Sequence, residues 1–146
     1  MPVLEAIALR PGKLEPMQLV ESAELDPARG IVGDYASEGE RQVTLISAEL
    51  WQRAMSDLGA DLPWHTRRAN LLIQGLDFAD LVGRKIRIGD AELQVHGVTH
   101  PCSLMDQFHA GLREALDSEL RCGVYGKVES GGTLEIGSPV EVVDSR

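Results

Sequence analysis

Short β-type runs broken by glycine turns are the feature that most constrains the fold of this chain. In KIRIGDAELQV, apolar residues alternate on both sides of Gly89-Asp90, a dipeptide that favours a tight hairpin turn. The C-terminal TLEIGSPVEVV has the same pattern around Ile136-Gly137, and we expect a second hairpin there. Fifteen glycines, and only two each of Trp, Tyr and Phe, agree with many short strands around a mostly aliphatic core.

Two segments show helical periodicity instead. Residues 47–59 follow the β-branched run RQVTLI, and Ser47 suits the N-cap while Gly59 suits the left-handed residue that ends a helix. Residues 103–120 carry a stripe of apolar side chains, so we expect a second helix there, although Gly111 weakens it. The run RRANLLIQG predicts a buried strand that is entered through two arginines.

Strands outnumber helices and do not alternate regularly with them, which disfavours a doubly wound parallel sheet. We expect a mostly β fold, a small closed or nearly closed antiparallel β-barrel with two or three peripheral helices. No linker, fixed repeat or low-complexity stretch divides the chain. Residues 1–146 are therefore expected to form a single domain.

The charge balance excludes several classes of partner. The chain carries 14 Lys plus Arg against 23 Asp plus Glu, a net charge of −9. Phosphate backbones and acidic membranes are held by excess cationic residues, so neither nucleic acid nor a membrane is an expected partner. No apolar run reaches the roughly 18 residues of a spanning helix, and Glu5 interrupts any signal-peptide core. We expect a soluble cytoplasmic protein.

Cys102 is the most informative candidate for chemistry. It follows Pro101 at the junction between a predicted strand and a predicted helix, with His100 as a potential proton partner. A helix N-terminus favours the thiolate, the form that attacks electrophiles and binds soft metals. The alternative is a buried cysteine that packs as a small apolar residue. Burial is also the interpretation favoured for Cys122, which could otherwise resolve an oxidised Cys102.

A second constellation comprises Arg67, Arg68 and Asn70. In an extended strand Arg68 and Asn70 lie on one face, where a guanidinium and an amide suit a phosphate or carboxylate. Arg67 would point the other way. The alternative is that these arginines pair with carboxylates of this acidic chain.

Two further groups have simpler interpretations. His96, His100 and Cys102 share a parity, and one strand face could present them to zinc, but solvent-exposed histidines are the preferred interpretation. Asp34 and Asp77 stand in turn-rich segments and are expected to cap local backbone.

Taken together, these segments resemble the MOSC family, a domain found at the C-terminus of molybdenum cofactor sulfurases and as small stand-alone bacterial proteins. The resemblance runs from about Gly30 to Val142. Its parts occur in the order of the family, namely GIVGD, RQVTLISAEL, RRANLLIQGLDFADLVGRKIRIGDAELQV, HPCSLMD and RCGVYGKVESGGTLEIGSPVEVV.

The resemblance implies a β-barrel with peripheral helices that binds a molybdenum–pterin cofactor or transfers sulfur. It implies that Cys102 ligates molybdenum and that Arg68 and Asn70 hold the pterin phosphate. Arg67 and Tyr125 are further candidates for the same cofactor site. A thiolate suits molybdenum as a soft ligand, and an arginine fork suits phosphate.

The chain departs from the family in two respects. Many members have Pro-Pro-Cys where this sequence has His100-Pro101-Cys102, so His100 is either a local variation or an added proton donor. Larger members also have an N-terminal barrel domain that helps to enclose the cofactor, and 146 residues leave no room for it. We therefore expect an open cleft, which a second subunit of a homodimer could close.

Three functions remain open at this point. The first is a molybdenum-dependent oxidoreductase for N-hydroxylated compounds, served by an electron-transfer protein. The second is a sulfur carrier with a persulfide on Cys102, charged by a sulfur-donor protein. The third is a non-catalytic module that binds the cofactor or zinc. Cofactor binding is preferred because a sulfur carrier gives no reason for Arg68 and Asn70.

Overall fold

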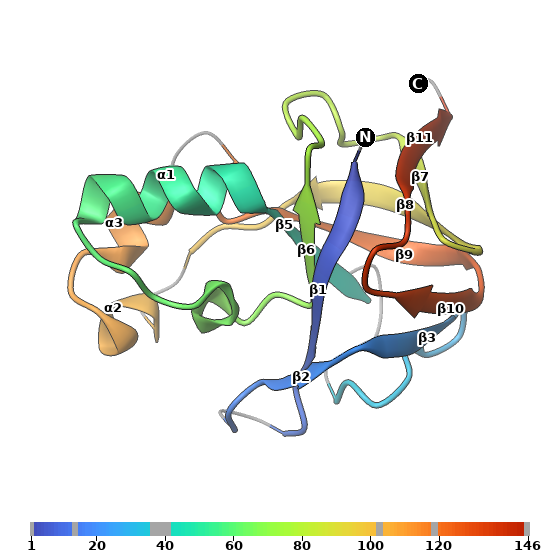
Figure 1. Ribbon diagram of the computed structural model, residues 1–146, viewed down its shortest axis with the longest axis horizontal. Coiled ribbons are helices and arrows are strands. Elements are labelled where there is room, and N and C mark those ends of the chain that lie inside the picture. The colour runs from blue at the N-terminus through green and yellow to red at the C-terminus, as the bar shows by residue number, and fades with distance from the viewer. Residues whose placement is uncertain (1, 13–14, 36–41, 102–103, 118–119, 145–146) are drawn as a thin grey trace.

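The computed structural model describes residues 2–12, 15–35, 42–101, 104–117 and 120–144. In this part of the chain the helices gather at one end of a strand-rich body (Figure 1). The strands are β1 (Val3–Leu9), β2 (Gln18–Val20), β3 (Ser22–Asp26), β4 (Gly30–Ile31), β5 (Val43–Ser47), β6 (Leu71–Gln74), β7 (Lys85–Ile88), β8 (Ala91–Val98), β9 (Val124–Ser130), β10 (Gly132–Glu135) and β11 (Val140–Asp144). The helices are α1 (Ala48–Leu58), the 3-10 helix η1 (Trp64–Arg67), α2 (Leu104–Phe108) and α3 (Leu112–Leu116).

Two sheets make up the strand-rich body. Eight strands form the larger sheet in the order β11-β7-β8-β9-β5-β6-β1-β2, and β10, β3 and β4 form the smaller one. Neighbouring strands are antiparallel except for β5 and β6, which are parallel. The mostly β class is therefore confirmed.

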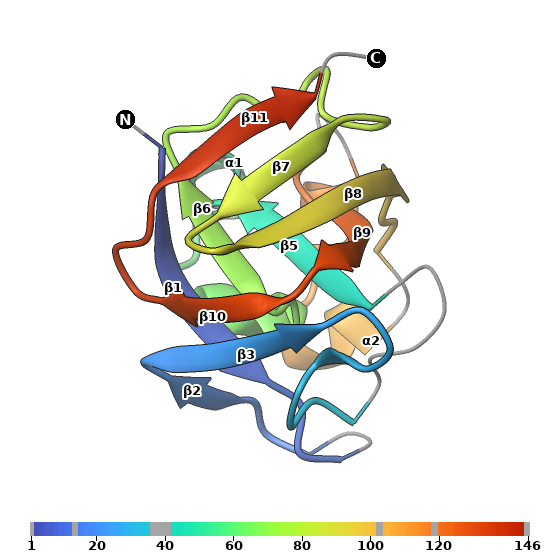
Figure 2. The same ribbon diagram turned by 90° about the vertical axis from the view of Figure 1, so that its right-hand side faces the viewer.

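The expected closed barrel is not confirmed, because neither sheet is closed within the described residues. The larger sheet curves, and β11 starts beside the beginning of β1 (Figure 2). A single isolated bridge joins Val3 to Pro139 there.

Two apolar clusters occupy the two faces of the large sheet. Along β5, Val43 and Leu45 belong to the cluster enclosed by the two sheets, whereas Ile46 joins the cluster under the helices. Trp51 of α1 and Leu112 of α3 pack in this second cluster. The alternation of side chains along one strand thus connects the strand-rich body to the helices.

The elements specified by local signals agree with the sequence. Ser47 caps α1 by accepting a hydrogen bond from the Leu50 amide at 3.2 Å, and Gly59 ends the helix with φ 69°. The predicted hairpin around Gly89-Asp90 is confirmed as β7 paired with β8. None of the helices in the described ranges is long and apolar enough to cross a membrane.

The predicted C-terminal hairpin is wrong. Strand β10 pairs with β3 and β11 pairs with β7, so the two strands belong to different sheets. The intervening backbone bonds to the start of β1 instead of folding back: the Gly137 amide donates to the Leu4 carbonyl, and the Leu4 amide donates to the Ser138 carbonyl. These contacts carry the chain from the small sheet to the edge of the large one.

The single helix expected over 103–120 is also wrong in part. Gly111 has φ 88°, in the left-handed region, and the chain there divides into α2 and α3. The glycine that weakened the helical pattern is therefore where the helix breaks.

Candidate functional site

Arg67 and Arg68 leave the chain in different directions. The prediction that Arg68 and Asn70 share a strand face is wrong, because β6 begins only at Leu71 and Arg68 is left-handed with φ 66°. Few residues other than glycine adopt this conformation. Arg68 Nη1 donates to the Glu15 carbonyl at 2.7 Å, whereas Arg67 Nε donates to the Cys122 carbonyl at 2.9 Å.

Arg10 lies close to Arg68 and is held by Asp34. The Asp34 carboxylate accepts hydrogen bonds from the Arg10 amide at 2.7 Å, from Nε at 3.2 Å and from Nη2 at 2.9 Å. Its side chain is 0% exposed. Asp34 was expected to cap local backbone, and its carboxylate also binds residues far away along the chain, Arg10 and Asn70.

The electrostatics at Arg68 favour an anion. Burial lowers the pKa of the Arg68 guanidinium and the nearby Arg10 lowers it further, while Tyr35 and Asp34 raise it. Among the described residues Arg68 makes no ion pair, and Asp34 already binds Arg10. Two neighbouring guanidinium groups thus have one carboxylate near them, which Arg10 already engages, and this arrangement suits phosphate. We call Arg10 and Arg68 the anion end of the site.

Asn70 is completely buried, and its amide is fully engaged by the protein. Oδ1 accepts from both the backbone amide and the hydroxyl of Thr44 at 3.1 Å. Nδ2 donates to the Ala8 carbonyl at 3.2 Å and to Asp34 Oδ1 at 3.1 Å. Asn70 therefore positions Asp34 and the surrounding strands, and both donors of its amide have protein acceptors.

A row of residues leads from Asn70 across the sheet to β8. Thr44 bonds to Asn70 and pairs with Tyr125 of β9, and Tyr125 pairs with Gly97 of β8. Thr44 alternates with Leu45 and so lies on the face that carries the helices. A Cβ atom at Gly97 would lie 2.6 Å from the Tyr125 hydroxyl, so glycine leaves room for the ring. We call Asn70, Thr44, Tyr125 and Gly97 the polar row; it spans three strand spacings, about 14 Å.

The polar row ends near a small cavity at the end of β8. The Thr99 hydroxyl donates to the Cys122 carbonyl at 2.6 Å, and Arg67 Nε lies 2.7 Å from Cys122 Sγ. Arg67, not Arg68, therefore reaches this end of the site. The cavity has a volume of about 170 Å³ and is lined by Val98, Thr99, His100, Pro101, Leu116, Asp117, Leu120 and Cys122.

The cysteines differ in what the structure shows of them. Cys122 is buried, as expected. Cys102 lies outside the described residues, between Pro101, which lines the small cavity, and Leu104, where α2 starts. Its role as thiolate or metal ligand stays a prediction. His100 is exposed at the same cavity.

The structure weakens one argument for a zinc site at His96, His100 and Cys102, the shared strand face. The pairing of β8 with β9 shifts register between Val95 and Gly97, which removes the regular alternation that placed His96 and His100 on one face. No group of three or more His, Cys, Asp or Glu side chains in the described part of the chain could hold a metal ion. The proposed set includes Cys102 and so stays a prediction.

Sequence reasoning missed Arg10 and Thr44. Arg10 lies 24 residues from Asp34 and Thr44 lies 26 residues from Asn70, so no local spacing links them. The sequence offered only an indirect signal: their partners Asp34 and Asn70 were identified, but Asp34 was assigned to a turn and Asn70 to a ligand.

Comparisons with known proteins agree with this architecture. The structure resembles the crystal structure of the YuaD protein of Bacillus subtilis, with a TM-score of 0.84 and 19% identity, over 100% of this chain and 98% of that one. It also resembles YiiM of Geobacillus stearothermophilus (TM-score 0.79, 20% identity, 99% and 76% covered) and YiiM of Escherichia coli (0.73, 20%, 99% and 70%).

At these identities the solved structures establish a shared fold. No match was found among curated proteins. The sequence matches the family model of the MOSC domain over residues 27–141, which is most of its length. The chain therefore belongs to the MOSC domain family.

Proposed function

We propose that this protein binds a molybdenum–pterin cofactor along the polar row, with the phosphate at the anion end and Cys102 as the metal ligand. The MOSC family is associated with this cofactor. The observation that carries the proposal is that Arg68 lies close to Arg10, while Asp34, the carboxylate near both, is already bound by Arg10. A partly buried guanidinium that makes no ion pair with the described residues fits a phosphate group.

Each described residue has a distinct task in this proposal. Arg68 and Arg10 bind phosphate oxygens, and Asp34 keeps Arg10 in place. Asn70 acts as a positioning residue, in contrast to the direct ligand role that the family resemblance implied. Tyr125 borders the path between the two ends.

The proposed reaction is reduction of an N-hydroxylated compound. Bound molybdenum supplies two-electron oxygen-atom chemistry. Two electrons from an electron-transfer protein and two protons break the N–O bond and release water, leaving an N–H group. His100 is exposed beside Pro101, where it can donate a proton.

Cofactor content tests this function. Protein produced in a molybdate-supplied host is expected to contain molybdenum and, after oxidative extraction, a fluorescent pterin. Arg68→Gln should lose most of both, because the phosphate contact is removed. The control Arg87→Gln should keep both, since Arg87 is exposed and pairs with Glu92 and Glu141. Equal loss in both variants, or absence of pterin from the unaltered protein, would contradict the proposal.

Sulfur transfer is the second candidate, and one contact favours it. Arg67 Nε lies 2.7 Å from Cys122 Sγ, and the cavity beside Cys122 is also lined by Pro101, so a cationic side chain lies near the residue that precedes Cys102. In this function Cys102 holds a persulfide. Intact-protein mass spectrometry after treatment with a small-molecule persulfide, which transfers its outer sulfur to the thiolate and leaves as a thiol, should show one added sulfur, lost in Cys102→Ala and retained in Cys122→Ala. Retention in Cys102→Ala would exclude this assignment.

A further inference from the structure

A second, larger cavity lies at the opposite ends of β5 and β6 from Thr44 and Asn70. Its volume is about 650 Å³, which falls in the range of roughly 300–1,000 Å³ typical of small-molecule sites. The proposed cofactor site does not use it. The cavity is lined by Ser47, Glu49, Leu50, Arg53, Gly75, Leu76, Asp77, Phe78, Ala79 and Leu120.

The cavity combines apolar side chains with two anchored carboxylates. Phe78 is buried, and Leu50 and Leu76 are partly buried beside it. Both Glu49 carboxylate oxygens accept from the Gly75 amide, at 3.2 and 3.1 Å. Asp77 Oδ1 accepts from the Ala79 amide at 2.9 Å. Backbone amides thus fix both carboxylates in place while leaving acceptor capacity on each.

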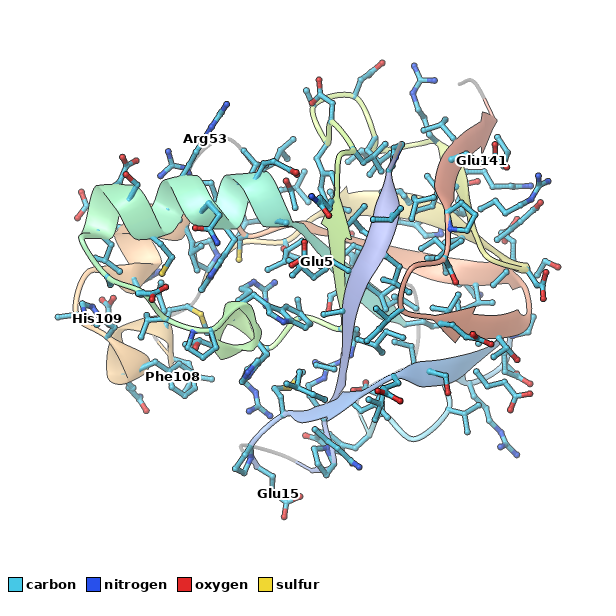
Figure 3. The ribbon with its side chains drawn as sticks, in the orientation of Figure 1. Glu5, Glu15, Arg53, Phe108, His109 and Glu141 are labelled. Atoms are coloured by element: carbon cyan, nitrogen blue, oxygen red, sulfur yellow. The ribbon has the colours of Figure 1, made fainter. Side chains whose placement is uncertain are left out.

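The charges of the cavity favour a cationic ligand. An anion could use the positive N-terminus of α1, but Ser47 caps this end and Glu49 lies in its first turn. The lining carries one cationic side chain, the exposed Arg53 (Figure 3), against the two carboxylates of Glu49 and Asp77. The net charge of −9 adds to the attraction of cations.

We propose that this cavity binds a small organic cation, with its apolar or aromatic body against Phe78 and Leu50 and its ammonium or amidinium group at Glu49 and Asp77. Leu120 lies between this cavity and the small cavity at Pro101. It has φ 63°, an uncommon conformation for a bulky residue, and lines both this cavity and the small cavity at Pro101. A ligand here lies beside Leu120, which also lines the small cavity at Pro101, and its binding requires no cofactor.

Binding of simple probes tests the proposal on the unmodified chain. Benzylamine, benzyl alcohol and benzoate share an aromatic body and differ in charge, and each is titrated while protein amide resonances are followed by NMR. Benzylamine should bind most tightly and shift the resonances of 47–53 and 75–79. Benzoate binding as well as benzylamine would overturn the cationic class, and no binding by any probe would overturn the site.

Matched variants locate the binding. Ala79→Trp should fill the cavity and abolish binding, whereas Ala28→Trp, at an exposed turn elsewhere, should not. Glu49→Gln should weaken benzylamine binding about tenfold or more, the effect of losing one charged hydrogen-bond partner. Glu141→Gln, on the distant β11 (Figure 3), should leave it unchanged. With melting temperatures confirming folded variants, unaltered binding by Ala79→Trp would refute the location.

Discussion

Asp34 is a short side chain in a turn, yet it organises the anion end of the site. Its carboxylate joins Arg10, which follows β1, to Asn70, which precedes β6. A buried carboxylate is tolerated only when donors satisfy it, and here the donors are a guanidinium, an amide side chain and a backbone amide. The same contacts that neutralise Asp34 therefore set the position of Arg10 beside Arg68.

Replacing Asp34 should affect both stability and anion binding. Asp34→Asn keeps an oxygen acceptor for Asn70 but leaves the Arg10 guanidinium without its counter-charge. We expect a loss on the order of 3 kcal/mol in the free energy of unfolding, as for other broken buried pairs. Urea denaturation measures this loss. Asp80→Asn is the control, because Asp80 is 63% exposed in its pair with Arg84 and should cost less than about 1 kcal/mol.

Arg68 should make sulfate a stabilising ligand of the protein. Because burial and Arg10 lower the pKa of Arg68, its charged form is disfavoured in the fold, and a bound anion offsets that cost. Sulfate at about ten times its dissociation constant would add about 1.4 kcal/mol. Thermal unfolding in sulfate and chloride at equal ionic strength measures the effect, which Arg68→Gln should abolish and Arg87→Gln should retain. An effect unchanged in Arg68→Gln would show that sulfate binds elsewhere.

Among the elements, the four strands β6, β5, β9 and β8 determine where the two ends of the site lie. Their register aligns Asn70, Thr44, Tyr125 and Gly97, and the bulge in β8 sets the last step. The close approach of β9 to β5 depends on Gly123. It has φ 97°, and a Cβ atom there would clash with the Leu45 carbonyl oxygen.

Gly123→Ala should therefore disturb the pairing of β9 with β5. The substitution combines an unfavourable φ with a backbone clash, and we expect a loss of about 2 kcal/mol or more. Gly59→Ala is a matched control, because Gly59 has φ 69° but, apart from its chain neighbours and the backbone of its own helix, no atom of the described residues lies within 4 Å of where its Cβ would be. It should cost only about 1 kcal/mol. If chemical denaturation gives equal losses of unfolding free energy for Gly123→Ala and Gly59→Ala, the contact with Leu45 is unimportant.

At the scale of the whole molecule, the sequence predicted what depends on neighbouring residues. Ser47 and Gly59 cap the two ends of α1, and Gly89-Asp90 forms the turn of a hairpin between adjacent strands. The pairing of strands was harder to predict from the sequence, because β10 and β11 are neighbours in sequence but pair with β3 and β7, respectively. Alternation identifies a strand and its buried face, but it does not specify which strand lies beside it.

The candidate site shows the same limit. Arg68 and Asn70 were identified by residue type, but their roles depend on partners distant in sequence. Asp34 lies 36 residues from Asn70, and Glu15 lies 53 residues from Arg68. The left-handed conformation of Arg68, before β6 begins, also removed the strand face that Arg68 and Asn70 were expected to share, and Arg68 instead donates to the Glu15 carbonyl.

The central claim is that one cofactor joins the anion end to the thiolate of Cys102. X-ray absorption at the molybdenum edge tests it most directly, because it counts the sulfur atoms bound to the metal. We predict that molybdenum in Cys102→Ser has one fewer sulfur neighbour than in the unaltered protein. In Cys122→Ala the number should be unchanged, because the Cys122 sulfur contacts Arg67 and is not a metal ligand in this proposal. Identical spectra from the unaltered protein and Cys102→Ser would contradict the claim, as would a protein that contains no molybdenum.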